Sequence, residues 1–379
     1  MMKSLKQRML NDIESTRGMA TKMAKLAGYA TANKFTTMLK KEDGDIEKFD
    51  GFVRVVHEMY PDEKFKYMEE FSKTLNPNRI TSRFMLEYLT LYKLDTSRDE
   101  LLLKMANCSN EDSKEWAFVY DMDVRLADKR IPIIEATHQL SSRNYITEEM
   151  KIYSQIVEFY AFYDLKNVDM MNDIYNNIED KINKLNNEFI RNDYMARLVL
   201  MEFAVRLHNN TLAAIREKIF TIDYALDPIK SYAYLQLGNS YMLVNYEKAR
   251  SFFEKSYECG TEISKKEARM SMNFTAILWN KFEDYVADGD KSNELFLYAK
   301  QQNEIEARKI LNDINFDKLN YNQKAFNCYY QALLLDDCNL FYKSIEYFNK
   351  SSDKFYKQLP ISELEKQGVN KFILNALSA

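Results

Sequence analysis

The chain has 379 residues, and its 53 basic and 57 acidic side chains give a formal net charge of −4. Only 8 Gly and 5 Pro occur, and helix-favouring residues recur throughout, so the composition predicts an all-α protein with few tight turns. No run of 18 or more apolar residues occurs and no apolar signal core follows the N-terminus, which argues against membrane insertion and secretion and favours a cytoplasmic location.

The charge is unevenly distributed along the chain. Residues 1–41 carry nine basic and two acidic side chains, a net charge of +7, and the remainder carries a net charge of −11. A small cationic end on a large anionic body predicts contact with nucleic acid at that end. The alternative interpretation is a solvated basic helix face.

The first 45 residues are predicted to form a DNA-binding domain of three short helices. Leu5, Met9 and Ile13 have helical spacing, and the following helix, at about 17–27, should stop at Gly28 because glycine readily adopts the left-handed conformation of a helix C-terminus. A third helix is expected at about 33–41. Helix, glycine-containing turn and helix make up the layout of a helix-turn-helix.

The start of the second helix of such a motif enters the major groove of DNA. Asn can pair with adenine and Lys can donate to guanine, whereas the other lysines of the segment are better placed for phosphates. The candidates that face bases are Thr31, Asn33, Lys34 and Thr37, and the candidates for phosphates are Lys22, Lys25, Lys40 and Lys41. A three-helix cap with solvated lysines and no DNA contact is the alternative.

Residues 46–75 are expected to form connector helices, and residues 76–379 a stack of antiparallel helix pairs. The apolar pattern of residues 215–222 recurs 34 residues later at 249–256, and 34 residues is the tetratricopeptide period. The positions that fit this repeat are Tyr234, Leu237, Gly238, Tyr241, Ala249 and Phe253. A weaker match follows at Ser344, Phe348 and Ser351. The sequence therefore predicts a tetratricopeptide-like superhelix.

Concave grooves of helical repeats commonly hold extended peptides. The amide of Asn both donates and accepts hydrogen bonds, so it suits an extended backbone. Asn239 and Asn273 lie within predicted helices and are candidates for this role. For Asn239, a hydrogen bond between helices of the protein itself is an equally good interpretation.

Motifs for catalysis, metal binding or phosphate binding are missing. His57, His138 and His208 lie in separate segments without metal-ligand spacing, and no nucleotide-binding loop or nucleophile elbow occurs. The four cysteines show no CxxC spacing and are expected to be buried, reduced thiols. We therefore expect no enzyme activity, no metal and no cofactor.

Several strings resemble the arbitrium receptors of temperate Bacillus phages, which are peptide-regulated receptors. The strings are Leu26-Ala27-Gly28-Tyr29, Tyr60-Pro61-Asp62, Leu86-Glu87-Tyr88, Cys108-Ser109-Asn110, Ser113-Lys114-Glu115, Leu237-Gly238-Asn239-Ser240, Ser344-Ile345-Glu346-Tyr347-Phe348, Ser352-Asp353-Lys354-Phe355 and Leu359-Pro360. The resemblance implies a helix-turn-helix on double-stranded operator DNA, a tetratricopeptide-like groove for a secreted hexapeptide, and a homodimer. It also implies that the peptide-free receptor activates a lysis-promoting locus and that the peptide favours lysogeny.

The resemblance also implies particular peptide-contacting residues. Asn239 and Asp353 match peptide-contacting positions of the family, whereas Ala204 and His208 stand where better-known members have asparagines. Pro228 replaces a groove arginine, with Lys230 the nearest basic substitute, so the peptide should differ from the known ones. The remaining candidates for the peptide site are Met242 and Phe355. An apolar C-terminal segment could cap the last repeat or pair with a second copy of the chain, and the resemblance favours the dimer contact; its residues are Phe372, Ile373, Leu374 and Leu377.

Two other functions remain possible on sequence grounds. A signalling modulator of a response regulator would have a helical head that contacts a protein instead of DNA, and the +7 charge speaks against it. A plain protein-interaction scaffold would show no salt-dependent DNA affinity.

Overall fold

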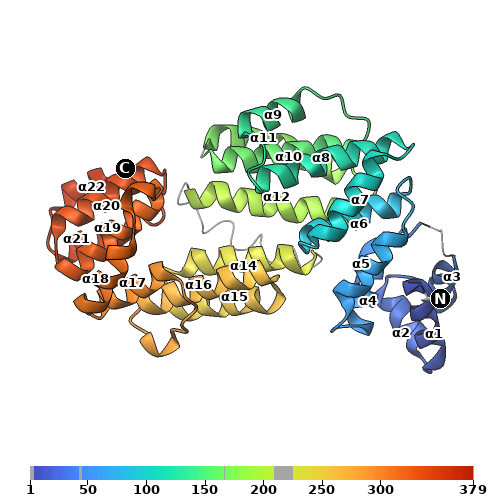
Figure 1. Cartoon of the computed structure of the whole chain (residues 1–379), viewed down its shortest axis with the longest axis horizontal. Coiled ribbons are helices and arrows are strands. Elements are labelled where there is room, and N and C mark those ends of the chain that lie inside the picture. The colour runs from blue at the N-terminus through green and yellow to red at the C-terminus, as the bar shows by residue number, and fades with distance from the viewer. Residues whose placement is uncertain (1–3, 42–44, 166, 209–224, 379) are drawn as a thin grey trace. The chain divides into compact units, whose positions relative to one another are not determined.

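The structure is a computed structural model that describes residues 4–41, 45–165, 167–208 and 225–378, with the backbone alone at helical positions 168, 169, 204, 205, 207, 208 and 378. Within these ranges every regular element is a helix (Figure 1). The predicted all-α class is confirmed. None of the helices among these residues is both long enough and apolar enough to cross a membrane.

The helices succeed one another with short connections. The N-terminal helices are α1 (Leu5–Ser15), α2 (Met19–Leu26), α3 (Ala32–Lys40), α4 (Phe49–Met59) and α5 (Lys64–Thr74). Next come α6 (Ile80–Leu91), α7 (Asp95–Ala106), α8 (Glu111–Ala127), α9 (Ile133–Ser141), α10 (Glu148–Asp164), α11 (Val168–Asn183) and α12 (Glu188–His208). The C-terminal α-helices are α14 (Asp227–Tyr241), α15 (Tyr246–Cys259), α16 (Glu262–Leu278), α17 (Lys291–Lys300), α18 (Glu304–Asp313), α19 (Tyr321–Leu335), α20 (Cys338–Lys350), α21 (Gln358–Lys366) and α22 (Lys371–Ser378). Two single-turn 3₁₀ helices lie among them, η3 (Phe282–Asp284) and η4 (Phe316–Lys318).

The chain divides into two compact units. The first unit comprises Met1–Phe162 and Asp173–Met195, and the second comprises Tyr163–Asn172 and Ala196–Ala379. The boundary therefore falls inside helices α10, α11 and α12. The functional division into residues 1–45, 46–75 and 76–379 stays a prediction.

Aromatic side chains build the core of the first unit, as expected from their abundance. Phe49 lies 6.0 Å from Phe84 and 5.3 Å from Phe189, measured between ring centroids, so α4, α6 and α12 meet there. A second row runs through α8, α10 and α12, in which neighbouring rings stack at centroid distances of 5.8, 4.5 and 5.4 Å. Its members are Trp116, Tyr120, Tyr153 and Tyr194.

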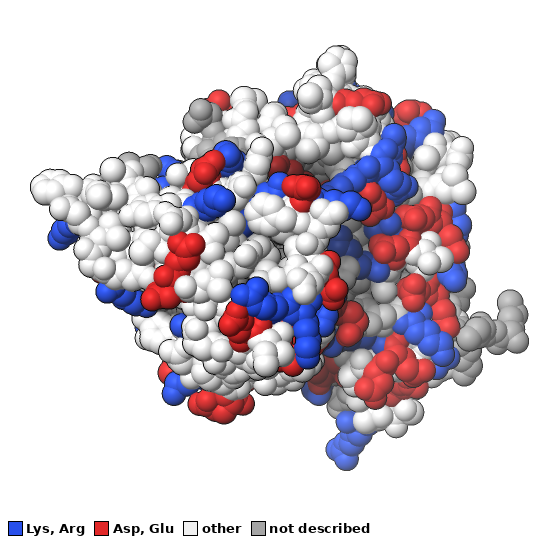
Figure 2. All heavy atoms as spheres, turned by 60° about the vertical axis from the view of Figure 1, so that its left-hand side comes forward, with Lys and Arg blue, Asp and Glu red and all other residues white. Residues whose placement is uncertain are grey.

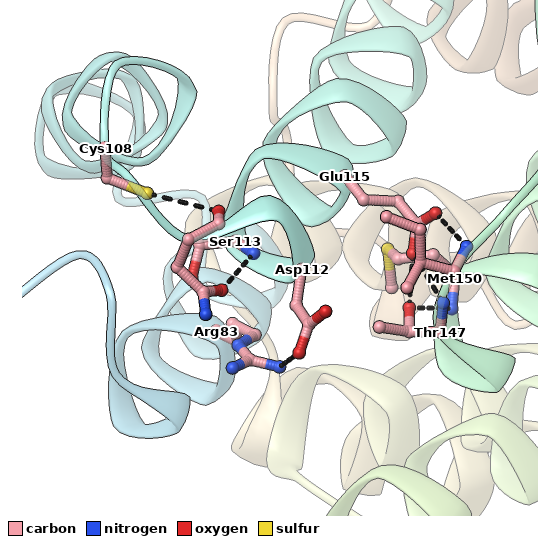
Figure 3. A network of polar contacts seen from close by, with 9 residues as sticks. Arg83, Cys108, Asp112, Ser113, Glu115, Thr147 and Met150 are labelled. Carbon is pink, nitrogen blue, oxygen red and sulfur yellow. Dashed lines mark hydrogen bonds and ion pairs between the residues drawn. The ribbon is translucent and has the colours of Figure 1, made fainter.

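A buried carboxylate joins α8 to the start of α10. Glu115 is 1% exposed, and it accepts hydrogen bonds from the backbone N–H groups of Ile146 and Thr147 and from the Thr147 hydroxyl (Figure 3). That hydroxyl in turn accepts from the N–H of Met150 at 3.3 Å. Because the first N–H groups of a helix lack partners within it, the Thr147 hydroxyl caps α10, and Glu115 holds the two residues that precede the helix.

His57 packs within a cluster of aromatic side chains in the first unit. Its Nε2 lies 2.9 Å from the Tyr88 hydroxyl, and its ring packs against Phe65 and Tyr92. Burial, together with the positive charge of Lys64, lowers the pKa of His57 to about 4. The ring is therefore neutral near pH 7.

The predicted pair of repeat helices that carries Gly238 and Phe253 is present in the second unit. Gly238 on α14 lies against the buried ring of Phe253 on α15, and a Cβ at Gly238 would come within 2.3 Å of Phe253 Cε1. The hydroxyl of Ser231 donates to the carbonyl of Ser256 at 2.8 Å. Residues 215–222, where the pattern begins, lie outside the described residues.

The weaker repeat match also corresponds to a helix pair. Ser344 and Phe348 on α20 are fully buried, and the Ser344 hydroxyl donates to the carbonyl of Ala325 on α19 at 2.8 Å. One prediction about the core was wrong, because Cys338 is exposed, whereas Cys328 is buried and Cys108 and Cys259 are half-buried.

Candidate functional site

Helices α2 and α3 and the turn between them have the layout of a helix-turn-helix. Gly28 ends α2 with a φ of +73°, and the N–H of Tyr29 donates to the carbonyl of Ala24 at 2.8 Å. The Thr31 hydroxyl accepts from the N–H of Lys34 at 3.3 Å, so Thr31 caps α3. The predicted helix end at Gly28 is confirmed, and Thr31 has a capping role that the sequence interpretation missed.

The two faces of α3 differ as its amphipathic pattern predicts. Phe35 and Leu39 are buried and fix the inner face of the helix. All eight predicted DNA-contacting side chains are exposed: Thr31, Asn33, Lys34, Thr37, Lys22, Lys25, Lys40 and Lys41. Asn33, Lys34 and Thr37 share the outer face of α3. Their contact with DNA stays a prediction.

The lysines of this surface are not electrostatically equivalent. Lys22 Nζ lies 2.6 Å from Glu58 Oε1 on α4, and Lys40 Nζ lies 3.7 Å from Glu14 Oε1 on α1. Within the described ranges, Lys25 makes no ion pair with any acidic side chain, and neither does Lys34.

Two other cations of the N-terminal segment serve the fold. Lys6 is 2% exposed, and its Nζ donates to the carbonyl of Lys41 at 3.0 Å. The guanidinium of Arg8 donates to the Tyr67 hydroxyl at 2.8 Å and lies over that ring. The net charge of +7 therefore overstates the charge that this segment can offer to a partner.

Helix α4 packs closely on the end of α2. Lys48 Nζ donates to the carbonyl of Gly28 at 2.7 Å, and Arg54 Nε donates to the carbonyl of Leu26 at 3.3 Å. Gly51 lies between Lys48 and Arg54 in the sequence. A Cβ at Gly51 would come within 2.3 Å of the Ala27 carbonyl oxygen. The connector thus holds α2 through its backbone, which periodicity alone does not reveal.

Asn239 has the environment expected of a ligand-contacting amide. It is half-buried on α14, and its Oδ1 is a buried acceptor without a hydrogen-bond partner among the described residues. The Oε1 of Gln236 is in the same state, three residues earlier on the same helix. Buried polar atoms are rarely left unpaired, so this face of α14 can accept donors from a ligand.

Asp353, in contrast, already has partners in the second unit. Its Oδ2 accepts from the Asn322 side chain at 2.7 Å, and its Oδ1 accepts from the N–H of Tyr356 at 2.9 Å. Burial raises the pKa of Tyr163, and the negative charge of Asp353 adds to the effect. Asp353 thus organises the turn after α20, and its contact with a peptide stays a prediction.

Asn273 serves the protein itself, contrary to its interpretation as a peptide reader. It is fully buried, and its amide donates to the carbonyl of Val286 at 2.7 Å and to Asp288 at 3.0 Å. Its carbonyl oxygen accepts from the N–H of Val286 at 3.0 Å. These hydrogen bonds hold residues 286–288 against α16.

The other peptide candidates lie in different environments. Lys230 is half-buried in the first turn of α14. Met242 and Phe355 are 1% and 5% exposed, so they support packing, and a ligand would reach them only if neighbouring side chains moved. Ala204 and His208 lie near the end of α12, and their side chains are outside the described residues.

The four predicted dimer residues separate into two pairs. Phe372 is 84% exposed and Ile373 is 48% exposed, whereas Leu374 is 6% exposed. Leu374 belongs to the apolar core of the second unit, and Leu377 is partly buried and packs against that core. Only the first pair presents an apolar surface to a partner.

Two further surface features lie away from these residues. An open cavity of about 520 Å³ in the first unit is lined by α7 and α8 residues, with the Arg143 guanidinium 4.2 Å above the ring of Phe118. No predicted site residue lines it.

On the face that Figure 2 shows, acidic and basic side chains are interspersed, in keeping with the many exposed ion pairs along single helices. Within the residues that the structure describes, no group of three or more His, Cys, Asp or Glu side chains could hold a metal ion.

Comparisons with known proteins agree on one family. A family model described as AimR transcriptional regulator-like matches residues 64–366. The AimR transcriptional regulator of Bacillus phage phi3T is 28% identical over 380 residues, which cover 97% of this chain and 99% of that protein. The AimR transcriptional regulator of Bacillus phage SPbeta is also 28% identical, over 97% of this chain and 98% of its own.

Solved structures support the same relationship. The structure of SeMet-phAimR has a TM-score of 0.85 and 26% sequence identity, covering 99% of this chain and 100% of its own. The structure of phAimR-Ligand has a TM-score of 0.74 at 24% identity, covering 86% of this chain and 99% of its own. The second comparison shows likeness of fold.

Proposed function

The chain belongs to the AimR transcriptional regulator-like family and is a transcription regulator, and we propose that it binds double-stranded operator DNA through α2 and α3. The observation that carries the proposal is the outer face of α3, where Asn33, Lys34 and Thr37 are exposed opposite the buried Phe35 and Leu39. Such a face can enter the major groove with donors directed at base edges. Family membership supports regulation of transcription and does not suggest a catalytic activity.

Replacing Lys34 with alanine is expected to weaken operator binding by about 1–3 kcal/mol and to reduce base preference. Lys25→Ala should instead weaken binding to all duplexes alike and make the slope of log affinity against log salt shallower by about 0.9, because one phosphate contact is lost. Lys25 and Lys34 are suited to this comparison because neither makes an ion pair with any residue that the structure describes.

The measurement is a salt series of fluorescence-anisotropy titrations with operator and random-sequence duplexes. Lys266→Ala, at an exposed position on α16, removes the same charge outside the proposed surface and should leave both affinities unchanged. DNA binding by Lys34→Ala and Lys25→Ala that equals that of Lys266→Ala at every salt concentration would refute the proposed surface.

We further propose that a short signalling peptide, a hexapeptide by analogy with the family, binds to the second unit and alters DNA binding. The buried acceptors of Asn239 and Gln236, which have no partner among the described residues, support this proposal, since a peptide offers backbone N–H donors to such groups. A ligand complex among the related solved structures is consistent with it. We place the protein in the cytoplasm of the bacterial host, where the peptide would set the choice between lysis and lysogeny.

Asn239→Ala is expected to weaken peptide binding by about two- to ten-fold, which corresponds to the loss of one neutral hydrogen bond. Isothermal titration calorimetry with a panel of family hexapeptides measures the effect. The matched control is Asn349→Ala, at an exposed position on α20. Equal affinities for the two variants, with a peptide that the unmodified protein binds, would remove Asn239 from the site.

We also propose a homodimer whose contact includes Phe372 and Ile373, the exposed apolar side chains of α22. A dimer would present two α3 helices to two DNA half-sites. The spacing between these helices would then be a quantity that a peptide could change.

A further inference from the structure

Two carboxylates lie within ion-pair distance of the proposed DNA-binding lysines. The Lys22–Glu58 pair joins α2 to α4 at 2.6 Å, and the Lys40–Glu14 pair joins α3 to α1 at 3.7 Å. Both acids come from helices outside the motif formed by α2 and α3. The pairs are therefore products of the tertiary packing of the N-terminal helices.

These pairs are too exposed to contribute much to stability. The side chains of Lys22 and Glu58 are 64% and 48% exposed, and those of Lys40 and Glu14 are 60% and 56% exposed. Ion pairs in such settings contribute little because water and salt screen them. Their main effect is on the charge of the surface, since each acid cancels one of the cations available to a phosphate.

We propose that Glu58 and Glu14 are intramolecular competitors of DNA phosphate, which keep Lys22 and Lys40 out of the phosphate contacts. They so limit the affinity of a single DNA-binding head, that is, of the α2 and α3 surface of one protomer. The inference rests on the proposed DNA-binding function and deepens it. Lys25, Lys34 and Lys41 are exposed and have no acidic partner within the described ranges, so they carry the contacts that remain. A carboxylate beside each paired lysine also repels an approaching phosphate.

Limited affinity of one head has a consequence for regulation. If one head binds weakly, high occupancy of an operator requires two heads to bind at once, and joint binding depends on their spacing. A ligand that alters the spacing then removes most of the affinity. Stronger phosphate contacts at each head would make binding less sensitive to that geometry.

The test compares Glu58→Gln with Glu47→Gln. Both substitutions remove one negative charge near the α2–α4 junction, but Glu47 is exposed and makes no ion pair within the described ranges. For each head bound to a random-sequence duplex, Glu58→Gln should steepen the slope of log affinity against log salt by about 0.9. The ratio of the variant's affinity to that of the unmodified protein should therefore be about eight-fold larger at 0.1 M salt than at 1 M salt. Glu14→Gln should act in the same direction.

A double variant, Lys22→Ala with Glu58→Gln, should return the slope to that of the unmodified protein, because the released lysine is then absent. The inference is overturned if Glu58→Gln and Glu47→Gln give the same slope, or if the double variant keeps the steeper one. Either result leaves the DNA-binding function intact. Failure of the unmodified protein to bind duplex DNA at any salt concentration would instead refute the proposed function.

Discussion

Replacing Glu115 with alanine is expected to lower the free energy of unfolding of the first unit by about 3–5 kcal/mol. The carboxylate is buried and accepts from three donors of Ile146 and Thr147, the two residues just before α10. Hydrogen bonds to a charged group contribute about 1.5–3 kcal/mol each and are not additive. Alanine leaves all three donors unpaired in a site with little access to water, so the loss should lie near the upper end for a single substitution.

Urea unfolding followed by tryptophan fluorescence measures this effect. The chain has two tryptophans, so a Trp279→Phe background leaves Trp116 on α8 as the reporter of the first unit. Glu135→Ala, at an exposed position on α9, is the control and should change stability by less than about 0.5 kcal/mol. A Glu115→Ala loss no larger than the Glu135→Ala loss would show that the cap of α10 contributes little.

Gly51→Ala is expected to destabilise the packing of α2 on α4 by about 1–3 kcal/mol. The new Cβ would lie 2.3 Å from the carbonyl oxygen, 2.7 Å from the carbonyl carbon and 2.8 Å from the Cα of Ala27. These are backbone atoms, which cannot rotate away, so the two helices must separate. Alanine gains up to about 1 kcal/mol over glycine inside a helix, which is too little to offset the clash.

Separation of α2 from α4 should also weaken DNA binding, because Lys48 and Arg54 hold the end of α2 through its carbonyl groups. Thermal unfolding, hydrogen exchange of α2 amides and operator affinity together measure the effect. Adding Ala27→Gly should not restore stability, since the clash involves the backbone of residue 27 and not its side chain. Recovery in that double variant would contradict the geometry.

Features set by a few neighbouring residues could be predicted from the sequence. Gly28 ends α2 because it can adopt a positive φ, and Phe35 and Leu39 are buried because helical spacing places them on one face. Gly238 and Phe253 meet because the repeat pattern fixes both helices of the pair. The resemblance of scattered strings to the arbitrium receptors led to the family that the comparisons confirm.

Individual polar residues were harder to interpret. Asn273 and Asn239 both lie within helices, yet the first is fully paired inside the protein and the second has an acceptor without a partner among the described residues. Residue type and helical position are the same for both, so only their neighbours distinguish them. The roles of Asn239 and Asp353 toward a peptide stay predictions.

By itself, the sequence determined the helical class, the local ends of several helices, the family and the exposed face of α3, because these depend on short-range patterns and on matching strings. Only the tertiary structure decided which charges of the N-terminal segment are available. Lys6 meets the carbonyl of Lys41, and Lys22 meets Glu58, across more than 30 residues of chain. Helical periodicity tells which side of a helix is buried but not which helix lies opposite, so a count of charges along the sequence cannot show which of them cancel.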